Sequence, residues 1–258
     1  MDLGLAGRTA LVTGASRGIG AACARVLAAE GVRVAVCARD GAMLDELVLE
    51  LGGGAAGHRS LAIDLMLPGA AQTLLAWLAE ALGDVDIVVH NLGGTLGVRD
   101  PLAPAADWER VFHFNLGIAI DLNAGLVPAM RARGHGRIVA ISSLAAFEHQ
   151  GSIAYSVAKA ALTAYIRGMG RTYAADGIVI SAVVPGVVLS EGGMWDDLTR
   201  RDPEAAQRYI DERIPRGRFG TPDEVAQAVA FLASRHAGPF LGSIVPLEGG
   251  QGRSFFGQ

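Results

Sequence analysis

Short apolar runs alternate with longer, helix-like stretches along nearly the whole chain of 258 residues. Runs with the length and residue types of buried strands lie at 8–13, 32–38, 60–63, 87–90, 137–142, 178–183 and 243–247. Stretches with helical length and periodicity lie between them, at 18–30, 43–51, 70–82, 105–133, 154–175 and 222–234. Such alternation is typical of a parallel sheet with helices on both faces. We therefore predict a single doubly wound α/β domain of about seven strands over residues 1–258.

The overall composition limits the partners that the chain is expected to have. The chain is 51% hydrophobic and 19% charged with a net charge of −4, which argues against disorder and against a nucleic-acid partner. Cys23 and Cys37 lie in apolar segments and are expected to be reduced core residues, and no metal site is predicted. No signal peptide is expected, nor a membrane span, because Asp121 and Pro185 interrupt the most apolar stretches. These features predict a cytoplasmic protein.

Lys159 is the only lysine among the 22 basic residues of the chain. It follows Tyr155 by four residues in a helical stretch, so the two side chains share one helix face. A nearby ammonium group favours the phenolate form of a tyrosine and lowers its pKa, which suits a general acid or base. A surface lysine on an amphipathic helix is the alternative, but arginine serves that purpose everywhere else in this chain. The pair is therefore predicted to be catalytic.

A glycine-rich turn joins the first predicted strand to the first predicted helix. Its residues are Gly14, Ser16, Arg17, Gly18, Ile19 and Gly20. Glycine permits a tight turn and a close backbone approach, and the N–H groups at a helix N-terminus attract phosphate. A turn of this kind also occurs without a ligand, but its place after a buried strand predicts dinucleotide binding.

The end of the second predicted strand bears on which nicotinamide cofactor is used. NAD sites usually have an acidic residue at this point for the ribose hydroxyls, whereas an arginine accommodates a 2′-phosphate. Here Ala38 is followed by Arg39, and Arg17 in the glycine turn is a second candidate for the same phosphate. Asp40 is the alternative, since it is close enough to face the ribose. The arrangement favours NADP(H) over NAD(H).

Two further polar features lie where apolar residues are expected. Ser142 and Ser143 end a buried strand, where a hydroxyl can hold a substrate carbonyl oxygen, although serines at strand ends also form ordinary turns. Asn115 lies inside an apolar helical stretch, and a structural hydrogen bond is one explanation for it.

Taken in order, these motifs resemble the short-chain dehydrogenase/reductase family in its single-domain, Tyr-x-x-x-Lys form, over residues 7–250. The resemblance implies a Rossmann-type fold and a catalytic set of Asn115, Ser143, Tyr155 and Lys159, with Ser143 favoured over Ser142. It also implies cofactor contacts from the glycine turn, from Tyr155 and Lys159, and from Arg39, Asp64, Leu65, Asn91, Gly93, Pro185, Gly186, Val188 and Ser190. The chain departs from the family pattern at His90, Leu92 and Val184.

The implied reaction is the interconversion of a ketone and a secondary alcohol by hydride transfer, with a 3-oxoacyl or polyketide-like substrate favoured. Residues 187–220 follow the carboxyl end of a strand without a clear place in the alternation, and are expected to form a substrate lid. An apolar pocket wall is expected from Leu96, Leu144, Phe147, Met194 and Trp195. Polar residues at the same mouth are expected to be Glu148, His149, Gln150, Glu191, Asp196 and Asp197.

Alternatives remain at the level of substrate and of function. Asp176 stands where relatives that act on acyl carrier protein are expected to have an arginine, which leaves a keto-sugar or sugar-derived alcohol open. A regulator that senses a dinucleotide without turnover is the alternative of another class. Relatives also imply a homotetramer or homodimer, formed through the helices at 105–133 and 154–175.

Overall fold

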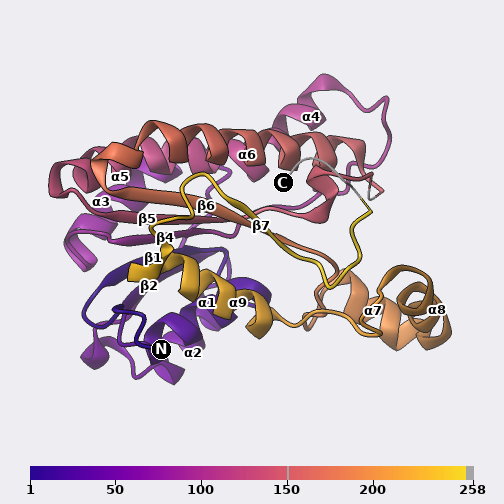
Figure 1. Ribbon diagram of the computed structural model, residues 1–258, viewed down its shortest axis with the longest axis horizontal. Helices are drawn as coiled ribbons and strands as arrows, with labels where there is room; N and C mark the ends of the chain where they lie inside the picture. The colour runs from indigo at the N-terminus through magenta and orange to yellow at the C-terminus, as the bar shows by residue number, and fades with distance from the viewer. Residues whose placement is uncertain (150, 254–258) are drawn as a thin grey trace.

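The computed structural model describes residues 1–149 and 151–253, and its centre is one parallel sheet (Figure 1). The strands are β1 (Thr9–Thr13), β2 (Arg33–Ala38), β3 (Arg59–Ala62), β4 (Ile87–His90), β5 (Gly136–Ile141), β6 (Ile178–Pro185) and β7 (Ile244–Leu247). They pair in the order β3-β2-β1-β4-β5-β6-β7, and each neighbouring pair is parallel. The chain order changes direction between β1 and β4, which creates a crevice at the carboxyl ends of these strands. The predicted doubly wound sheet of seven strands is confirmed.

Helices cover both faces of the sheet. Figure 1 shows α3 (Ala70–Ala81), α5 (Ile118–Arg133) and α6 (Ile153–Thr172) on one side, and α1 (Gly18–Ala29), α2 (Gly41–Glu50) and α9 (Pro222–Ala233) on the other. Leu122, Ile138 and Ile166 are buried in the core on the first side, whereas Leu27 and Val229 are buried in the core on the second side. Full burial of one such side chain contributes about 1.5–3 kcal/mol, so these two cores hold the layers together.

The stretch 105–133 was predicted as one helix, and it contains an irregularity. It consists of α4 (Ala105–Phe112), a π-helical turn (His113–Gly117) and α5. Asn115 lies in that turn and its side chain donates a hydrogen bond to the Val111 carbonyl at 2.8 Å. By length and composition the whole run could cross a membrane, and 44% of its most apolar part is buried inside the protein. Leu122, Val127 and Met130 belong to the sheet core, so we assign this run as a core helix.

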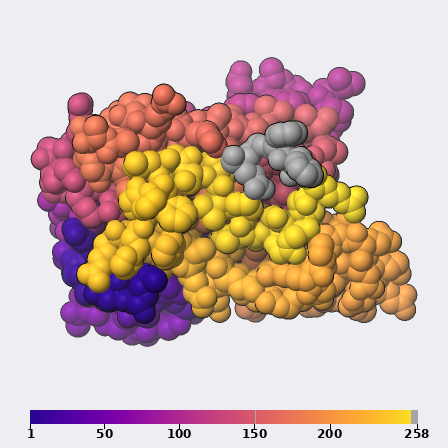
Figure 2. Space-filling view, in the orientation of Figure 1, coloured from indigo at the N-terminus to yellow at the C-terminus, as the bar shows by residue number. Residues whose placement is uncertain are grey.

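Residues 187–220 form two helices beside the main body, α7 (Met194–Arg201) and α8 (Pro203–Arg213). Figures 1 and 2 show them as a projecting lobe. The Trp195 ring lies 4.3 Å from that of Tyr209 and 5.3 Å from that of Phe219, between centroids. At the base of the segment, the Gly220 N–H donates to the Val187 carbonyl at 2.8 Å. The segment therefore has an aromatic core of its own and a closed base.

Candidate active site

The glycine turn brings the backbone of β1, α1 and the end of β4 close together. Gly14 and Gly18 have φ values of +64° and +59°, a region that favours glycine. The Asn91 side chain donates to the Gly14 carbonyl at 2.9 Å. A Cβ at Gly20 would lie 2.4 Å from that carbonyl oxygen and 2.5 Å from Asn91 Nδ2, so only glycine fits there. Arg17 occupies the N-cap of α1 without a side-chain cap, which leaves the first N–H groups of the helix to attract an anion.

A cavity of about 420 Å³, the Arg39 cavity, lies beside this turn. Of the predicted cofactor contacts, it is lined by Gly14, Ser16, Arg17, Arg39, Asp64 and Leu65. Asp40 also lines it, but its carboxylate accepts the Met43 N–H at 3.2 Å and caps α2. Asp64 accepts the Met66 N–H at 2.9 Å, so it too stabilises a turn. Arg39 is exposed and remains the basic group at this end of the site.

A smaller cavity of about 240 Å³, the linking cavity, connects the Arg39 cavity to the rest of the site. It shares Gly14 and Arg17 with the Arg39 cavity, and it also includes Gly18. The Arg17 guanidinium donates to the Gly192 carbonyl at 3.2 Å, so it holds the 187–220 segment as well as lining the groove. Asn91, Gly93 and Ser190 are shared with a third cavity described next.

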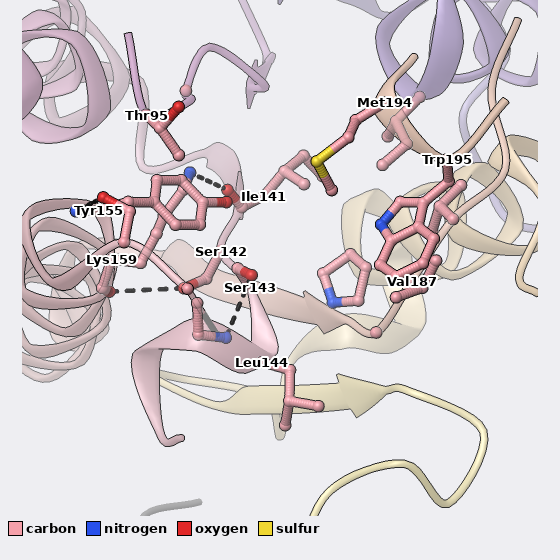
Figure 3. Close-up of a pocket in the computed structure, with 18 of the residues that line it drawn as sticks. Thr95, Ile141, Ser142, Ser143, Leu144, Tyr155, Lys159, Val187, Met194 and Trp195 are labelled. Carbon is pink, nitrogen blue, oxygen red and sulfur yellow. Dashed lines mark hydrogen bonds between the residues drawn. The ribbon is translucent and has the colours of Figure 1, made fainter. Parts of the chain in front are cut away.

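The third cavity, of about 550 Å³, holds the predicted catalytic groups and is named here the Tyr155 cavity (Figure 3). Its predicted lining residues are Ile19, Asn91, Gly93, Ser143, Tyr155, Lys159, Pro185, Gly186, Val188 and Ser190. Both candidate serines, Ser142 and Ser143, line this cavity. The buried Ser142 hydroxyl lies 2.9 Å from the Thr163 hydroxyl on α6, whereas the Ser143 hydroxyl accepts the Ala145 N–H at 3.2 Å and lies near the Tyr155 phenol. These surroundings favour Ser143 as the serine that binds a substrate oxygen, and this role stays a prediction.

The electrostatics of Tyr155 and Lys159 differ from the prediction made from their spacing. Burial raises the pKa of the Tyr155 phenol, and the nearby Ser143 hydroxyl only opposes that shift. Burial also lowers the pKa of Lys159 to about 7. The ammonium Nζ donates to the Ile141 carbonyl at 2.8 Å and lies 5.8 Å from the Tyr155 ring centroid. Loss of hydration is the main cause of both shifts, so the expected lowering of the tyrosine pKa is wrong for this arrangement.

Asn115 is buried beside the catalytic pair, and its side chain is engaged with backbone groups. Its amide nitrogen donates to the carbonyls of Gly94 and Val111, both at 2.8 Å, and its oxygen accepts the Gly94 N–H at 3.0 Å. A Cβ at Gly93 would lie 2.7 Å from Asn115 Oδ1 and 2.6 Å from Lys159 Nζ. The side chain therefore holds the loop after β4 beside Lys159, and the catalytic role of Asn115 stays a prediction.

His90, one of the departures from the family pattern, belongs to a chain of polar contacts next to the site. Its Nε2 lies 2.8 Å from Asn123 Oδ1, and the Asn123 amide donates to the Tyr165 hydroxyl at 3.2 Å. Burial lowers the pKa of His90 to about 4, so the ring is neutral at neutral pH. This polar chain joins β4, α5 and α6 behind the loop that carries Asn91 and Gly93.

The predicted pocket wall is only partly as expected. Leu144, Met194 and Trp195 line the Tyr155 cavity, whereas Leu96 lines the Arg39 cavity. Phe147 packs against the sheet core instead of lining the site, because the turn after β5 directs it inward.

The polar residues predicted at the mouth do not line the Tyr155 cavity within the described part of the chain. Glu148 accepts the Arg253 N–H, and Asp196 pairs with Arg200. Glu191 lines the linking cavity, and Gln150 lies outside the described residues. Asp176 pairs with Arg131, with 3.0 Å between nitrogen and oxygen.

Several lining residues were not identified from the sequence. Gln251 is buried; its side-chain oxygen accepts the Val187 N–H at 3.0 Å and its nitrogen donates to the Tyr209 hydroxyl at 2.9 Å. Thr95 and Arg99, in the loop between β4 and α4, also line the Tyr155 cavity. No local spacing indicates these three residues, because the fold alone brings their segments to the site.

The three cavities share lining residues and thus form one groove, from Arg39 to Tyr155. It offers a basic group at one end, open N–H groups of a helix terminus in the middle, and a tyrosine with a lysine at the other end. This arrangement fits a dinucleotide with an additional phosphate on its adenosine half.

Comparison with known proteins agrees with this geometry. Residues 14–251 match the family model described as enoyl-(acyl carrier protein) reductase. The chain is 34% identical over 248 residues to the 3-oxoacyl-[acyl-carrier-protein] reductase of Escherichia coli (strain K12), covering 95% of this chain and 97% of that protein. It is 36% identical over 260 residues to cis-4-hydroxycyclohexanecarboxylate dehydrogenase of Sinomonas cyclohexanicum, covering 97% and 98%. Among solved structures, L-sorbose reductase from Gluconobacter frateurii, complexed with NADPH and L-sorbose, has a TM-score of 0.89 and 30% identity, covering 99% and 100%.

Proposed function

This chain belongs to the short-chain dehydrogenase/reductase family, and we propose that it uses Ser143, Tyr155 and Lys159 for the chemistry of that family. It is an NADP(H)-dependent oxidoreductase that interconverts a ketone and a secondary alcohol. The observation that supports the residue roles best is the continuity of one groove, in which the glycine turn and Arg39 lead to these three side chains.

The proposed roles follow from the protonation states of the two buried groups. With its pKa raised, the Tyr155 phenol keeps its proton at neutral pH and can deliver it to a carbonyl oxygen. Ser143 donates a hydrogen bond to the same oxygen as negative charge develops there. Lys159, whose pKa is about 7, can hold a proton at Nζ and pass it toward the phenolate that remains. Asn115 positions the loop at Gly93 and Gly94, which lies between the Asn115 and Lys159 side chains.

The cofactor roles concern binding and orientation. NADP(H), when bound, supplies or accepts the hydride. Arg39 provides a fork of N–H donors for the 2′-phosphate, and the open end of α1 binds the pyrophosphate. Pro185 ends β6, and Gly186, Val188 and Ser190 follow it along the Tyr155 cavity, where the four residues would border the nicotinamide.

The favoured substrate is a 3-oxoacyl or polyketide-like ketone. Leu144, Met194 and Trp195 contribute apolar lining to the Tyr155 cavity, which suits a carbon chain or ring better than a sugar. The 3-oxoacyl reductase of Escherichia coli supports this choice. A keto-sugar is the second candidate, favoured by the similarity to L-sorbose reductase.

Three features of the working protein complete the proposal. Residues 187–220 serve as a lid, since Met194 and Trp195 line the Tyr155 cavity from this segment. The protein is cytoplasmic and needs no nucleic acid, membrane or metal. It forms a homotetramer or homodimer through the helices at 105–133 and 154–175.

The test is the consumption of NADPH, beside NADH, over a panel of 3-oxoacyl thioesters, aromatic diketones and keto-sugars. Tyr155→Phe is expected to lower the rate at least ~100-fold, because it removes the acid without changing the ring. Tyr173→Phe, on the same helix layer but outside the three cavities, is the matched control. Cofactor binding with no turnover of any ketone would instead favour the regulator that senses a dinucleotide.

A further inference from the structure

The Tyr155 cavity has an uneven distribution of charge. Among its described lining residues there is no aspartate or glutamate, and the charged ones are Lys159 and Arg99. Lys159 is buried at the base of the cavity and donates to the Ile141 carbonyl. Arg99 comes from the loop between β4 and α4, on the exposed side of the cavity. The substrate region therefore presents one guanidinium and no carboxylate.

The backbone beside Arg99 is attached directly to the helix that carries Tyr155. The Ser152 hydroxyl donates to the Val98 carbonyl at 2.7 Å and also accepts the Tyr155 N–H at 3.3 Å. The Val98 side chain packs against the small cluster that contains Val111 and Ala154. One residue after this attachment point, Arg99 has its Cα at a fixed place relative to the catalytic tyrosine.

The charge of Arg99 is not used elsewhere within the described part of the chain. None of the ion pairs there involves it. The adjacent carboxylate of Asp100 accepts the Leu102 N–H at 2.8 Å and so stabilises its own turn. A guanidinium offers paired N–H donors that match a carboxylate or a phosphate.

We propose that Arg99 binds an oxyanion of the substrate, a carboxylate or a phosphate, so that the natural substrate is an anionic ketone or alcohol. This inference rests on the proposed function, and it narrows the substrate class. The apolar wall of Leu144, Met194 and Trp195 contacts the carbon skeleton, Ser143 and Tyr155 bind the ketone oxygen, and Arg99 binds the anionic end. Binding of two ends of one molecule selects its orientation toward the catalytic groups.

The test compares anionic and neutral ketones of the same skeleton. The pairs are acetoacetate with ethyl acetoacetate, 4-oxocyclohexanecarboxylate with its carboxamide, and dihydroxyacetone phosphate with dihydroxyacetone. KM and kcat are measured with NADPH for the unaltered protein, Arg99→Gln, Arg99→Lys and the control Arg110→Gln. Arg110 is a suitable control because it is an exposed arginine on α4, outside the three cavities.

The expected result is that Arg99→Gln raises KM for the preferred anionic ketone by about 10-fold or more. The kcat value and the KM of the neutral partner change by less than about threefold, Arg99→Lys recovers part of the loss, and Arg110→Gln has no effect. The KM for the anion also rises with salt in the unaltered protein and not in Arg99→Gln. Whether the carboxylate or the phosphate pair shows the larger dependence identifies the oxyanion.

A second readout separates failure of this inference from failure of the proposed function. Binding of the same ketones to the Tyr155→Phe protein loaded with NADP⁺ is measured by calorimetry. Turnover of ketones with no preference for the anion, unchanged by Arg99→Gln, overturns the role of Arg99 and leaves the reductase intact. Anion binding that depends on Arg99 without turnover of any ketone in the active protein supports the site and overturns the proposed reaction. If no ketone is turned over and no anion binding depends on Arg99, the inference is overturned.

Discussion

At the residue scale, burial of the Lys159 amine lowers the stability of the folded chain near neutral pH, although the proposed function needs this amine in the site. Lys159 is 3% exposed, and burial lowers its pKa from the ordinary 10.5 to about 7. Between these values the unfolded chain binds a proton that the folded chain does not, so stability rises with pH across this window. The proposed proton exchange with Tyr155 explains why a buried lysine is retained, since its Nζ lies 5.8 Å from the centre of the Tyr155 ring. Its burial, caused by β5 and the loop that carries Gly93, is also what lowers the pKa of the ammonium group.

Lys159→Met is therefore expected to abolish activity while increasing the free energy of unfolding at pH 7. One pKa unit corresponds to about 1.4 kcal/mol, and the unpaired Ile141 carbonyl offsets part of the gain, so the expected increase is about 1–4 kcal/mol. The increase is largest at and below pH 7 and disappears as the pH approaches 10.5. Urea denaturation at pH 7, 8.5 and 10 measures it, with Lys159→Arg as the variant that keeps the charge. A difference that does not change with pH would contradict the assignment.

At the element scale, residues 187–220 form a unit beside the main body, and the ion pairs of Arg216 and Arg218 with Glu224 join its end to α9. The aromatic core of Trp195, Tyr209 and Phe219 holds α7 and α8 together. Gln251, which follows β7, forms hydrogen bonds with Val187 at the base of this segment and with Tyr209 on α8. A segment with its own small core can move as a body when its attachments are released, and such loops gate many active sites.

Removal of the Gln251 side chain should loosen this segment. Each of the two lost hydrogen bonds contributes about 1 kcal/mol, so Gln251→Ala is expected to increase the open population by up to about 30-fold. The measurement is the rate of trypsin cleavage at the arginines of α7 and α8, together with KM for the best ketone; both should rise. Gln227→Ala, at an exposed position of α9, is the control. Equal cleavage rates in the two variants would exclude Gln251 as the attachment.

At the scale of the whole molecule, α6 has an exposed face that the sheet does not use. Val157, Ala160, Ala164 and Gly168 are exposed along this face, and small residues permit another helix to approach closely. We expect a tetramer of the 26.7 kDa chain by light scattering. Ala164→Arg should shift it to a smaller assembly, whereas Ala42→Arg, on an exposed part of α2, should not. A monomer for the unaltered protein would contradict the expectation.

The sequence by itself determined the features that depend on near neighbours in the chain. The alternation of strands and helices, the glycine turn and the Tyr155–Lys159 spacing are local, because helix and strand periods and turn chemistry act over a few residues. Only the tertiary structure gave Ser142 and Ser143 different surroundings, placed Leu96 and Phe147 away from the expected wall, and brought Arg99 and Gln251 to the site. It also reversed the expected pKa shift of Tyr155. These outcomes depend on contacts between distant segments and on the loss of hydration that their packing causes, and local spacing carries no information about either.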